Sequence, residues 1–257
     1  MIAEGQRLAL VTGGRHRLGA AIAARLTRAG YALAIHGSHS CELDPELAEA
    51  LEGQAWHGFV ADFLHADAAA GLFAEVTEQF GRAPDLLVNN ASLFGDGGLA
   101  EVTAADLAAY QAVNCAAPTL LTQAFAAAEA RSPNAGNRAI VNILDQRIDQ
   151  PHGDQLAYTL SKLGLAGLTQ IAARTLAPAI RVNAVAPGLV IPTVDYAEAQ
   201  ADRLAQRMPL ARLPQASEVA EAVLYLAQAR SVTGQVLYVD AGARLVSFDR
   251  DFVRLER

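Results

Sequence analysis

Short apolar runs alternate with longer amphipathic stretches along the whole chain, and this alternation constrains the fold more than any other feature. Seven runs are rich in Val, Ile and Leu without strict polar alternation, as is typical of strands buried on both faces; they are Leu8–Val11, Ala32–His36, Ala55–Val60, Leu86–Asn89, Ala139–Ile143, Arg181–Val185 and Gln235–Val239. Helical patterns lie between them, at Leu18–Ala29, Pro45–Leu51, Ala68–Phe80, Ala104–Arg131, Gln155–Ala177 and Glu218–Ala229. The alternation predicts an α/β fold with one doubly wound, mostly parallel sheet of about seven strands and helices on both faces.

One domain over residues 1–257 is the organisation that the sequence favours. No linker rich in Pro, Gly or Ser and no long repeat divides the 257 residues, and single α/β domains reach this length. A net charge of −7 argues against a nucleic-acid surface, which needs clustered basic residues. Cys41 and Cys115 lie in unrelated contexts, with no CxxC and no His/Cys cluster at metal-ligand spacing, so we expect a reduced, cytoplasmic protein without a metal site. No run of about twenty apolar residues is available to span a membrane.

A glycine-rich turn, Thr12-Gly-Gly-Arg-His-Arg-Leu-Gly19, joins the first predicted strand to the first predicted helix. Glycines in this context allow backbone N–H groups to approach a pyrophosphate at the helix N-terminus. A plain strand–helix turn is the alternative, but the context is the one that dinucleotide binding requires. The turn therefore predicts a Rossmann-type sheet that binds a dinucleotide.

The segment after the second strand, Ser38-His39-Ser40, bears on which dinucleotide is bound. An acidic residue there would hold a ribose 2′-hydroxyl and repel a 2′-phosphate. This chain has no carboxylate in the segment, and Arg15, His16 and Arg17 are close by in the glycine turn. The sequence therefore favours NADPH over NADH, although a neutral loop that tolerates both is the alternative.

Tyr158 and Lys162 are four residues apart in a helical stretch and share one helix face. A tyrosine has an unperturbed pKa of about 10, and a neighbouring ammonium is expected to lower the pKa of Tyr158 toward the range of a useful general acid. Such a pair, taken alone, is more often a feature of a helix surface. Its interpretation depends on the other motifs in the chain.

Those motifs share the order and spacing of a known family. They are the Thr12–Gly19 turn, Asp62 after the third strand, Asn89-Asn90-Ala91 after the fourth, Asn114 in the long helix, Tyr158-x-x-x-Lys162 and Arg181-Val-Asn-Ala-Val-Ala-Pro-Gly188. With them the chain resembles the short-chain dehydrogenases/reductases over nearly its whole length.

The resemblance implies a role for each motif. Asp62 would contact adenine, Asn114 would support a proton-relay water, and Lys162 would also bind the nicotinamide ribose. The implied cofactor-binding residues are Gly13, Arg17, Leu18, Gly19, Asp62, Asn90, Ala91, Ser92, Tyr158, Lys162, Pro187 and Gly188, to which the phosphate argument adds Ser38, His39 and Ser40. The family usually forms homotetramers through its long helices, so we expect one here.

Two departures from the common family pattern indicate a subgroup. Arg17 stands where a third glycine is usual, and Asp145, thirteen residues before Tyr158, stands where a serine is usual. Both changes resemble the pteridine reductases, including the bacterial dihydromonapterin reductases. Their Asn-Ala-Ser-x-Phe segment is matched at residues 90–94, where Ser92 would touch cofactor and pterin and the Phe94 ring would stack on the pterin. The chain departs from them at Val190, where a small hydroxyl is expected, and at Ser38-His39, where a histidine–arginine pair is expected.

The chemistry of Asp145 agrees with this subgroup. A carbonyl reductase develops negative charge on oxygen, which a hydroxyl stabilises and a carboxylate would repel. Reduction of a pterin C=N bond instead needs a proton on nitrogen, and a carboxylate hydrogen-bonded to Tyr158 assists that delivery. The predicted catalytic residues are therefore Asp145, Tyr158, Lys162 and Asn114, and the predicted substrate-binding residues are Arg17, Ser92, Phe94, Asp145 and Tyr158.

The predicted function is NADPH-dependent reduction of a dihydropterin, such as dihydromonapterin or dihydrobiopterin, with dihydrofolate as a further substrate. A carbonyl or 3-oxoacyl reductase of the same fold is the first alternative, and a non-catalytic dinucleotide-sensing protein is the second. A further alternative is that Asp145 replaces the usual serine because the chain is an inactive relative of the family. The loop Pro187–Ala201 follows a late strand and is a candidate lid over the site.

Overall fold

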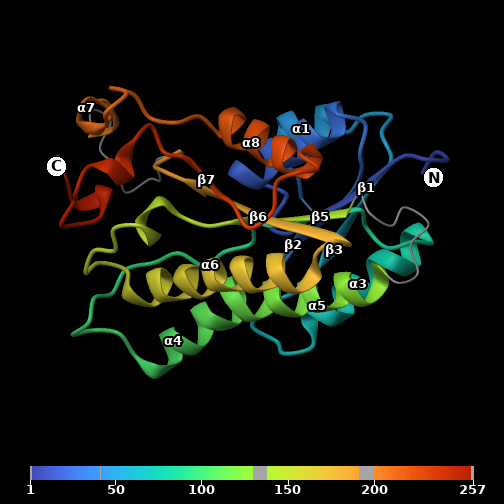
Figure 1. Cartoon of the computed structure of the whole chain (residues 1–257), viewed down its shortest axis with the longest axis horizontal. Helices are drawn as coiled ribbons and strands as arrows, with labels where there is room; N and C mark the ends of the chain where they lie inside the picture. Colours follow the sequence, from blue (N-terminus) through green and yellow to red (C-terminus); the bar gives the residue numbers. More distant parts are fainter. Residues whose placement is uncertain (1, 41, 130–137, 191–199, 256–257) are drawn as a thin grey trace.

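The protein has a three-layered architecture in the computed structural model, which describes residues 2–40, 42–129, 138–190 and 200–255 (Figure 1). Seven parallel strands form one sheet in the order β3-β2-β1-β4-β5-β6-β7. Their bounds are β1 Leu8–Val11, β2 Ala32–Gly37, β3 Trp56–Val60, β4 Leu86–Asn89, β5 Arg138–Ile143, β6 Ile180–Pro187 and β7 Val236–Val239. The predicted α/β fold is confirmed, and the sheet, predicted to be mostly parallel, is parallel throughout. Every predicted strand lies within two residues of its observed bounds.

Helices cover both faces of the sheet, as Figure 1 shows with α1 and α8 on one side and α3, α5 and α6 on the other. One apolar cluster packs α1 and α8 on one face of β1, β4 and β5, and a second packs α3, α5 and α6 on the opposite face. The helices are α1 Arg17–Arg28, α2 Pro45–Ala50, α3 Ala68–Phe80, α4 Ala104–Gln111, α5 Ala117–Glu129, α6 Leu156–Leu176, α7 Gln200–Arg207 and α8 Ala216–Gln228.

The central and edge strands differ in burial. All residues of β1, β2, β4 and β5 are buried, which explains their continuous apolar sequences. The edge strand β3 is exposed at Trp56, His57 and Val60, and Trp56 is 37% exposed. The edge position of β3 leaves Trp56 without the cover that the central strands have.

The stretch 104–131 was expected to be one helix and instead contains a break. A capping box between Thr103 and Asp106 starts α4, and a π-helical turn, η1 (Ala112–Ala116), separates α4 from α5. Wide turns of this kind often occur at functional positions. Here the turn contains Asn114, which is completely buried.

The chain after β7 folds back over the carboxyl ends of the strands. This C-terminal segment, residues 240–255, contains two short 3₁₀ turns, η3 (Ala243–Leu245) and η4 (Phe252–Arg254). Figure 1 shows it beside α7, and Phe252 packs with Leu204 and Met208 in a separate apolar cluster. None of the helices in the described ranges is long and apolar enough to cross a membrane.

Candidate active site

A cavity of about 930 Å³ opens at the carboxyl ends of the strands. In open α/β sheets this edge is where ligands bind. Its lining combines the β1–α1 turn, the segment after β4, the end of β5, one face of α6, the end of β6 and the C-terminal segment; the lining residues include Arg17, Leu18, Asn90, Ser92, Phe94, Asp145, Arg147, Tyr158, Lys162, Pro187, Gly188, Val190, Asp251 and Phe252. Most residues that the sequence predicted for the site therefore lie around one cavity.

Close backbone approach explains the glycines of the β1–α1 turn. A Cβ atom on Gly19 would lie 1.9 Å from the Gly13 carbonyl oxygen, and one on Gly13 would lie 2.9 Å from Ala91 Cα. The Asn90 side chain donates to the carbonyls of Thr12 and Gly13 at 3.0 and 2.9 Å, and the Thr12 hydroxyl accepts from the Asn90 and Ala91 N–H groups. Asn90 and Ala91 thus brace the turn from β4.

Arg17 adopts a backbone conformation that normally favours glycine, with φ of +55°. Its N–H donates to Asp44 Oδ2 at 2.8 Å, and His16 Nδ1 contacts the other oxygen of the same carboxylate at 2.8 Å. Arg17 itself is exposed and lines the cavity. Asp44 therefore stabilises the left-handed turn that places the arginine there, a role that sequence reasoning did not find because Asp44 lies in a polar loop without a motif.

His36, at the end of β2, supports the turn from beneath. Its Nδ1 accepts from the Gly13 N–H at 3.1 Å and its Nε2 contacts the Ala61 carbonyl at 2.8 Å. The ring also stacks on Phe63, with centroids 4.4 Å apart. Burial lowers the pKa of His36 to about 4, so the ring is neutral at physiological pH, and its two hydrogen bonds place the proton on Nε2. No sequence motif indicates this role of His36.

Hydroxyl, imidazole and guanidinium groups gather beyond the end of β2. The Arg15 guanidinium donates to Ser40 Oγ at 2.5 Å and to the Glu42 carbonyl at 3.2 Å. His39 Nδ1 lies 2.7 Å from Ser38 Oγ, and all three residues of the Ser38–Ser40 segment are exposed. Asp62, after β3, accepts from the Leu64 N–H at 3.0 Å. The predicted phosphate-binding groups therefore come together beside the glycine turn.

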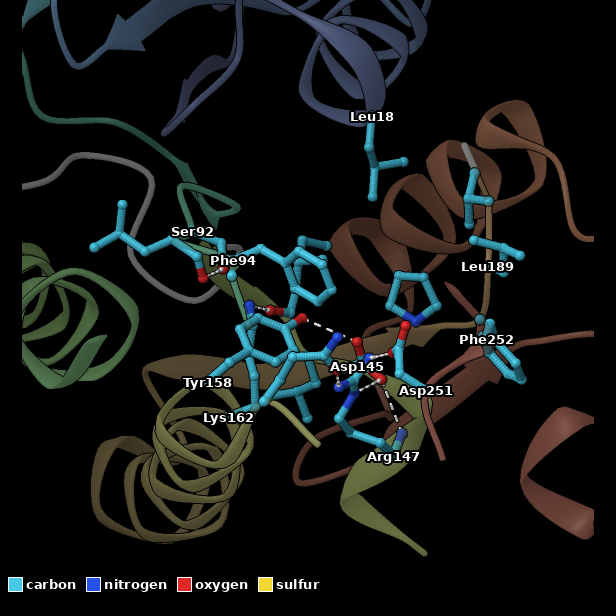
Figure 2. A pocket seen from close by; sticks show the side chains of 18 of the residues that line it. Leu18, Ser92, Phe94, Asp145, Arg147, Tyr158, Lys162, Leu189, Asp251 and Phe252 are labelled. Carbon is cyan, nitrogen blue, oxygen red and sulfur yellow. Dashed lines mark hydrogen bonds and ion pairs between the residues drawn. The ribbon is translucent and has the colours of Figure 1, made fainter. Parts of the chain in front are cut away.

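Tyr158 and Asp145 form a direct pair. The Tyr158 hydroxyl donates to Asp145 Oδ2 at 2.9 Å (Figure 2). Burial, followed by the adjacent Asp145 carboxylate, raises the pKa of Tyr158 well above its usual value. The expectation that Lys162 lowers this pKa is wrong for this structure, because the Lys162 ammonium donates to the Ile143 carbonyl at 2.8 Å and lies 5.6 Å from the tyrosine ring centre.

Lys162 is almost completely buried beneath the cavity. Burial lowers its pKa to about 8, against an opposing effect of the Asp145 carboxylate. The side chain therefore stays mostly charged at pH 7 and sits close to its titration range. A buried ammonium of this kind suits a cavity that receives hydroxyl groups of a bound ligand.

Arg147 and Asp251 join this centre and were not predicted. Arg147 Nε lies 3.1 Å from Asp145 Oδ1, and Arg147 Nη2 lies 2.9 Å from Asp251 Oδ2. Dashed lines in Figure 2 trace this chain of contacts from Tyr158 to Asp251. Burial lowers the pKa of Arg147, but the neighbouring Asp145 and Asp251 carboxylates contribute to a net rise above its usual value. Arg147, Asp251 and Lys162 are buried and Asp145 is partly buried. The two carboxylates of this group balance its two cations.

Phe94 and Ser92 lie at the mouth of the cavity, and Asn114 lies behind it. The Phe94 ring is 55% exposed and meets the Tyr158 ring edge-on at 4.9 Å. Asn114 accepts from the Leu93 N–H at 2.7 Å and donates to Ser161 Oγ at 2.9 Å. Asn114 thus anchors the segment that carries Ser92 and Phe94 onto α6, and it does not itself line the cavity.

Two other predictions bear on the cavity rim. Pro187 ends β6, and the Gly188 N–H donates to the Val239 carbonyl at 3.0 Å, which fixes the start of the following loop. The candidate lid, Pro187–Ala201, is described only at residues 187–190 and 200–201, so most of that prediction lies outside the described residues. No group of three or more potential metal ligands occurs within the described part of the chain.

A comparison with protein families identifies the group to which this architecture belongs. The enoyl-(acyl carrier protein) reductase family of short-chain dehydrogenases/reductases matches residues 14–244. The chain belongs to the short-chain dehydrogenases/reductases. It is therefore an oxidoreductase of this family, whose members use NAD(H) or NADP(H).

Different relatives of this chain are named for different substrates. It is 34% identical to a putative ketoacyl reductase of the granaticin polyketide synthase from Streptomyces violaceoruber, over 93% of this chain and 96% of the relative. It is 32% identical to pteridine reductase 1 of Leishmania tarentolae, over 93% and 96%. A solved structure of FolM alternative dihydrofolate reductase 1 from Brucella suis, in complex with NADP, is 32% identical with a TM-score of 0.83, covering 96% of this chain and 98% of that one.

Proposed function

We propose that this protein is an NADPH-dependent pteridine reductase that transfers hydride to a dihydropterin and yields the tetrahydro form. The observation that carries the proposal is the Asp145–Tyr158 hydrogen bond of 2.9 Å at the floor of the cavity. A carboxylate at this position disfavours an oxyanion and favours protonation of a ring nitrogen. The similarity to pteridine reductase 1 and to the FolM structure supports the same conclusion.

The residues present fit a dinucleotide. Gly13 and Gly19 leave a cradle that Cβ atoms would close, and the N-terminus of α1 faces the cavity through Arg17 and Leu18. Arg15 with Ser38, His39 and Ser40 would hold a ribose 2′-phosphate, with the guanidinium as the permanent charge. The FolM relative was solved with NADP, which supports NADPH as the cofactor here.

The bound nicotinamide would supply the hydride, and this chain's own residues would place and protonate the substrate. The half-exposed Phe94 ring offers a face for a flat pterin. Ser92 and Arg17, which both line the cavity, offer a hydroxyl and a guanidinium to the polar edge of the pterin. Tyr158, whose raised pKa keeps its hydroxyl protonated at physiological pH, would give that proton to the substrate nitrogen. Lys162 would bind the nicotinamide ribose.

A carbonyl or 3-oxoacyl reductase is the second candidate, because a ketoacyl reductase is among the relatives at 34% identity. Tyr158, Lys162 and Asn114 serve either reaction. The two candidates differ at Asp145, since a hydroxyl donor at that position would stabilise a carbonyl oxyanion better than a carboxylate.

Substitution of Asp145 tests the proposal directly. Wild-type protein and Asp145→Ser are assayed for NADPH oxidation with 7,8-dihydropterins, dihydrofolate, and a 3-oxoacyl thioester. We expect wild-type turnover of a dihydropterin and a loss of roughly 100-fold or more in Asp145→Ser, with unchanged or improved ketone reduction. Ketone turnover without any pterin turnover contradicts the proposal, and tight NADPH binding without turnover of any substrate favours a sensing protein.

A homotetramer is part of the same proposal. α6 exposes Leu160, Leu163 and Ile171 along one side, with exposed fractions of 41%, 38% and 66%. Gly167 on the same helix has open space above its Cα, so a second chain can approach closely. Light scattering behind gel filtration should give four times the chain mass, and Ile171→Glu should reduce it.

A further inference from the structure

Arg147 is a deeply buried charge of the site to which the proposed chemistry gives no role. It follows Asp145 by two residues in η2 (Gln146–Ile148), and its side chain is 5% exposed. Its guanidinium lies 5.0 Å from the Tyr158 ring centre and 5.6 Å from the Phe94 ring centre. Burying a guanidinium at such a position costs free energy unless its charge is paired and its N–H groups are hydrogen-bonded.

The two oxygens of Asp145 have different partners. Oδ1 accepts from the Arg147 backbone N–H at 2.9 Å and from Arg147 Nε at 3.1 Å. Oδ2 accepts from the Tyr158 hydroxyl at 2.9 Å. Because Arg147 occupies Oδ1 by two hydrogen bonds, the carboxylate cannot rotate without breaking both, and Oδ2 stays directed at the tyrosine.

Asp251 holds the opposite side of the guanidinium. Arg147 Nη2 donates to Asp251 Oδ2 at 2.9 Å, and Nη1 donates to Gln155 Oε1. Asp251 is 2% exposed and comes from the C-terminal segment, 104 residues away in sequence. The Arg147 side chain is thus fixed at both ends by buried partners.

The C-terminal segment is itself anchored on two sides. The Asp251 N–H donates to Asp154 Oδ2 at 2.9 Å, and Asp251 Oδ1 accepts from the Val253 N–H at 2.9 Å. Gln200, at the start of α7, donates to the carbonyls of Phe252, Val253 and Leu255 at 3.2, 3.1 and 2.6 Å. Asp251 therefore has a fixed position from which to hold Arg147.

We propose that Arg147 and Asp251 are positioning residues for proton delivery, through which the C-terminal segment fixes the orientation of Asp145 toward Tyr158. Neither residue donates the proton. Arg147 restricts the rotation of the Asp145 carboxylate, and Asp251 prevents the guanidinium from leaving Oδ1. The inference rests on the proposed function only in that Tyr158 is the proton donor.

Four variants test this on the full-length protein. Arg147→Met removes the positive charge. Arg147→Lys keeps the charge, but the lysine has no planar group that can bond to Asp145 and Asp251 together. Asp251→Asn removes the negative charge that faces Arg147 and keeps the size of the side chain. The matched control is Asp85→Asn. Asp85 is also 2% exposed and pairs with Arg82, but it lies before β4 at the opposite edge of the sheet. Measurements are kcat, KM, NADPH affinity by fluorescence, solvent deuterium isotope effect and melting temperature.

A positioned acid contributes about 10²–10⁴-fold to the rate, and loss of its orientation removes part of that contribution. We therefore expect kcat to fall roughly 10- to 100-fold in Arg147→Met and about tenfold in Asp251→Asn. NADPH affinity should stay within about twofold, the solvent isotope effect should rise, and Arg147→Lys should recover part of the lost kcat. Asp85→Asn should lower the melting temperature without changing kcat. If Arg147→Met does not fold, Asp251→Asn carries the test, because it keeps the size of every side chain.

Equal kcat and isotope effect in wild type, Asp251→Asn and Asp85→Asn would overturn the proposal, as would a loss confined to NADPH affinity. The series is run on whichever substrate wild type reduces, pterin or ketone, so failure of the pterin assignment leaves it intact. A readout without turnover is the ¹³C signal of the Tyr158 ring carbon that bears the hydroxyl, assigned with Tyr158→Phe. That signal should move in Asp251→Asn and stay in Asp85→Asn, and an unmoved signal in Asp251→Asn contradicts the proposal.

Discussion

Protonation of His36 provides a quantitative test of how the cofactor turn is supported. The pKa of this histidine falls from 6.5 to about 4 on folding, because the ring is buried. Since the folded pKa is below the unfolded one, the stabilising contribution is complete above pH 6.5 and is lost as the pH falls toward 4. A folded pKa about 2.5 units below the unfolded one lowers the free energy of unfolding by about 2 kcal/mol at pH 5 and by about 3 kcal/mol at pH 4, relative to neutral pH.

The assay is urea unfolding of wild type and His36→Asn at several pH values between 7.5 and 4, followed by circular dichroism and by the fluorescence of Trp56, the single tryptophan. The difference in free energy of unfolding between wild type and His36→Asn should change by about 3 kcal/mol from pH 7.5 to pH 4, in the direction that disfavours wild type. His65→Asn is the control, because that side chain is 82% exposed. A difference between wild type and His36→Asn that is independent of pH would refute the argument.

Three further perturbations address the cofactor and the turn. Arg17→Gly should keep or raise the melting temperature, because the positive φ costs a non-glycine residue about 1 kcal/mol. The same substitution should weaken pterin or NADPH binding. A marked drop in melting temperature would contradict this account of Arg17. Arg15→Met should weaken NADPH binding by roughly tenfold and leave NADH binding almost unchanged, as measured by fluorescence titration; equal losses would remove Arg15 from the phosphate site. Because the pKa of Lys162 is about 8 and its ammonium is lost above that pH, NADPH affinity should fall from pH 7 to pH 9 in wild type and be independent of pH in Lys162→Met.

The fold and the outline of the site could be predicted because they depend on local patterns. Continuous apolar runs such as Leu86–Asn89 are sufficient to identify buried parallel strands. The topology then places the segments after β1, β4 and β5 at one edge of the sheet. Asp145 and Tyr158 were expected to meet from their spacing and the family resemblance, and they do so at 2.9 Å.

The remaining features depend on tertiary contacts that leave no local pattern. Arg147 and Asp251 are 104 residues apart, and the C-terminal segment has no motif to indicate that it returns to the cavity. Asp44 is one of several acidic residues in loops, and only the turn geometry shows that it supports Arg17. The pKa of Tyr158 was predicted in the wrong direction because spacing along a helix shows proximity to Lys162 but does not show burial.

The ratio of kcat/KM for a 7,8-dihydropterin to kcat/KM for a 3-oxoacyl thioester, both with saturating NADPH, tests the central claim most directly. The position of Asp145 beside the Tyr158 hydroxyl predicts a ratio well above one in wild type and a fall of the ratio by roughly 100-fold in Asp145→Ser. A wild-type ratio below one that Asp145→Ser leaves unchanged would contradict the assignment of this site to pterin reduction.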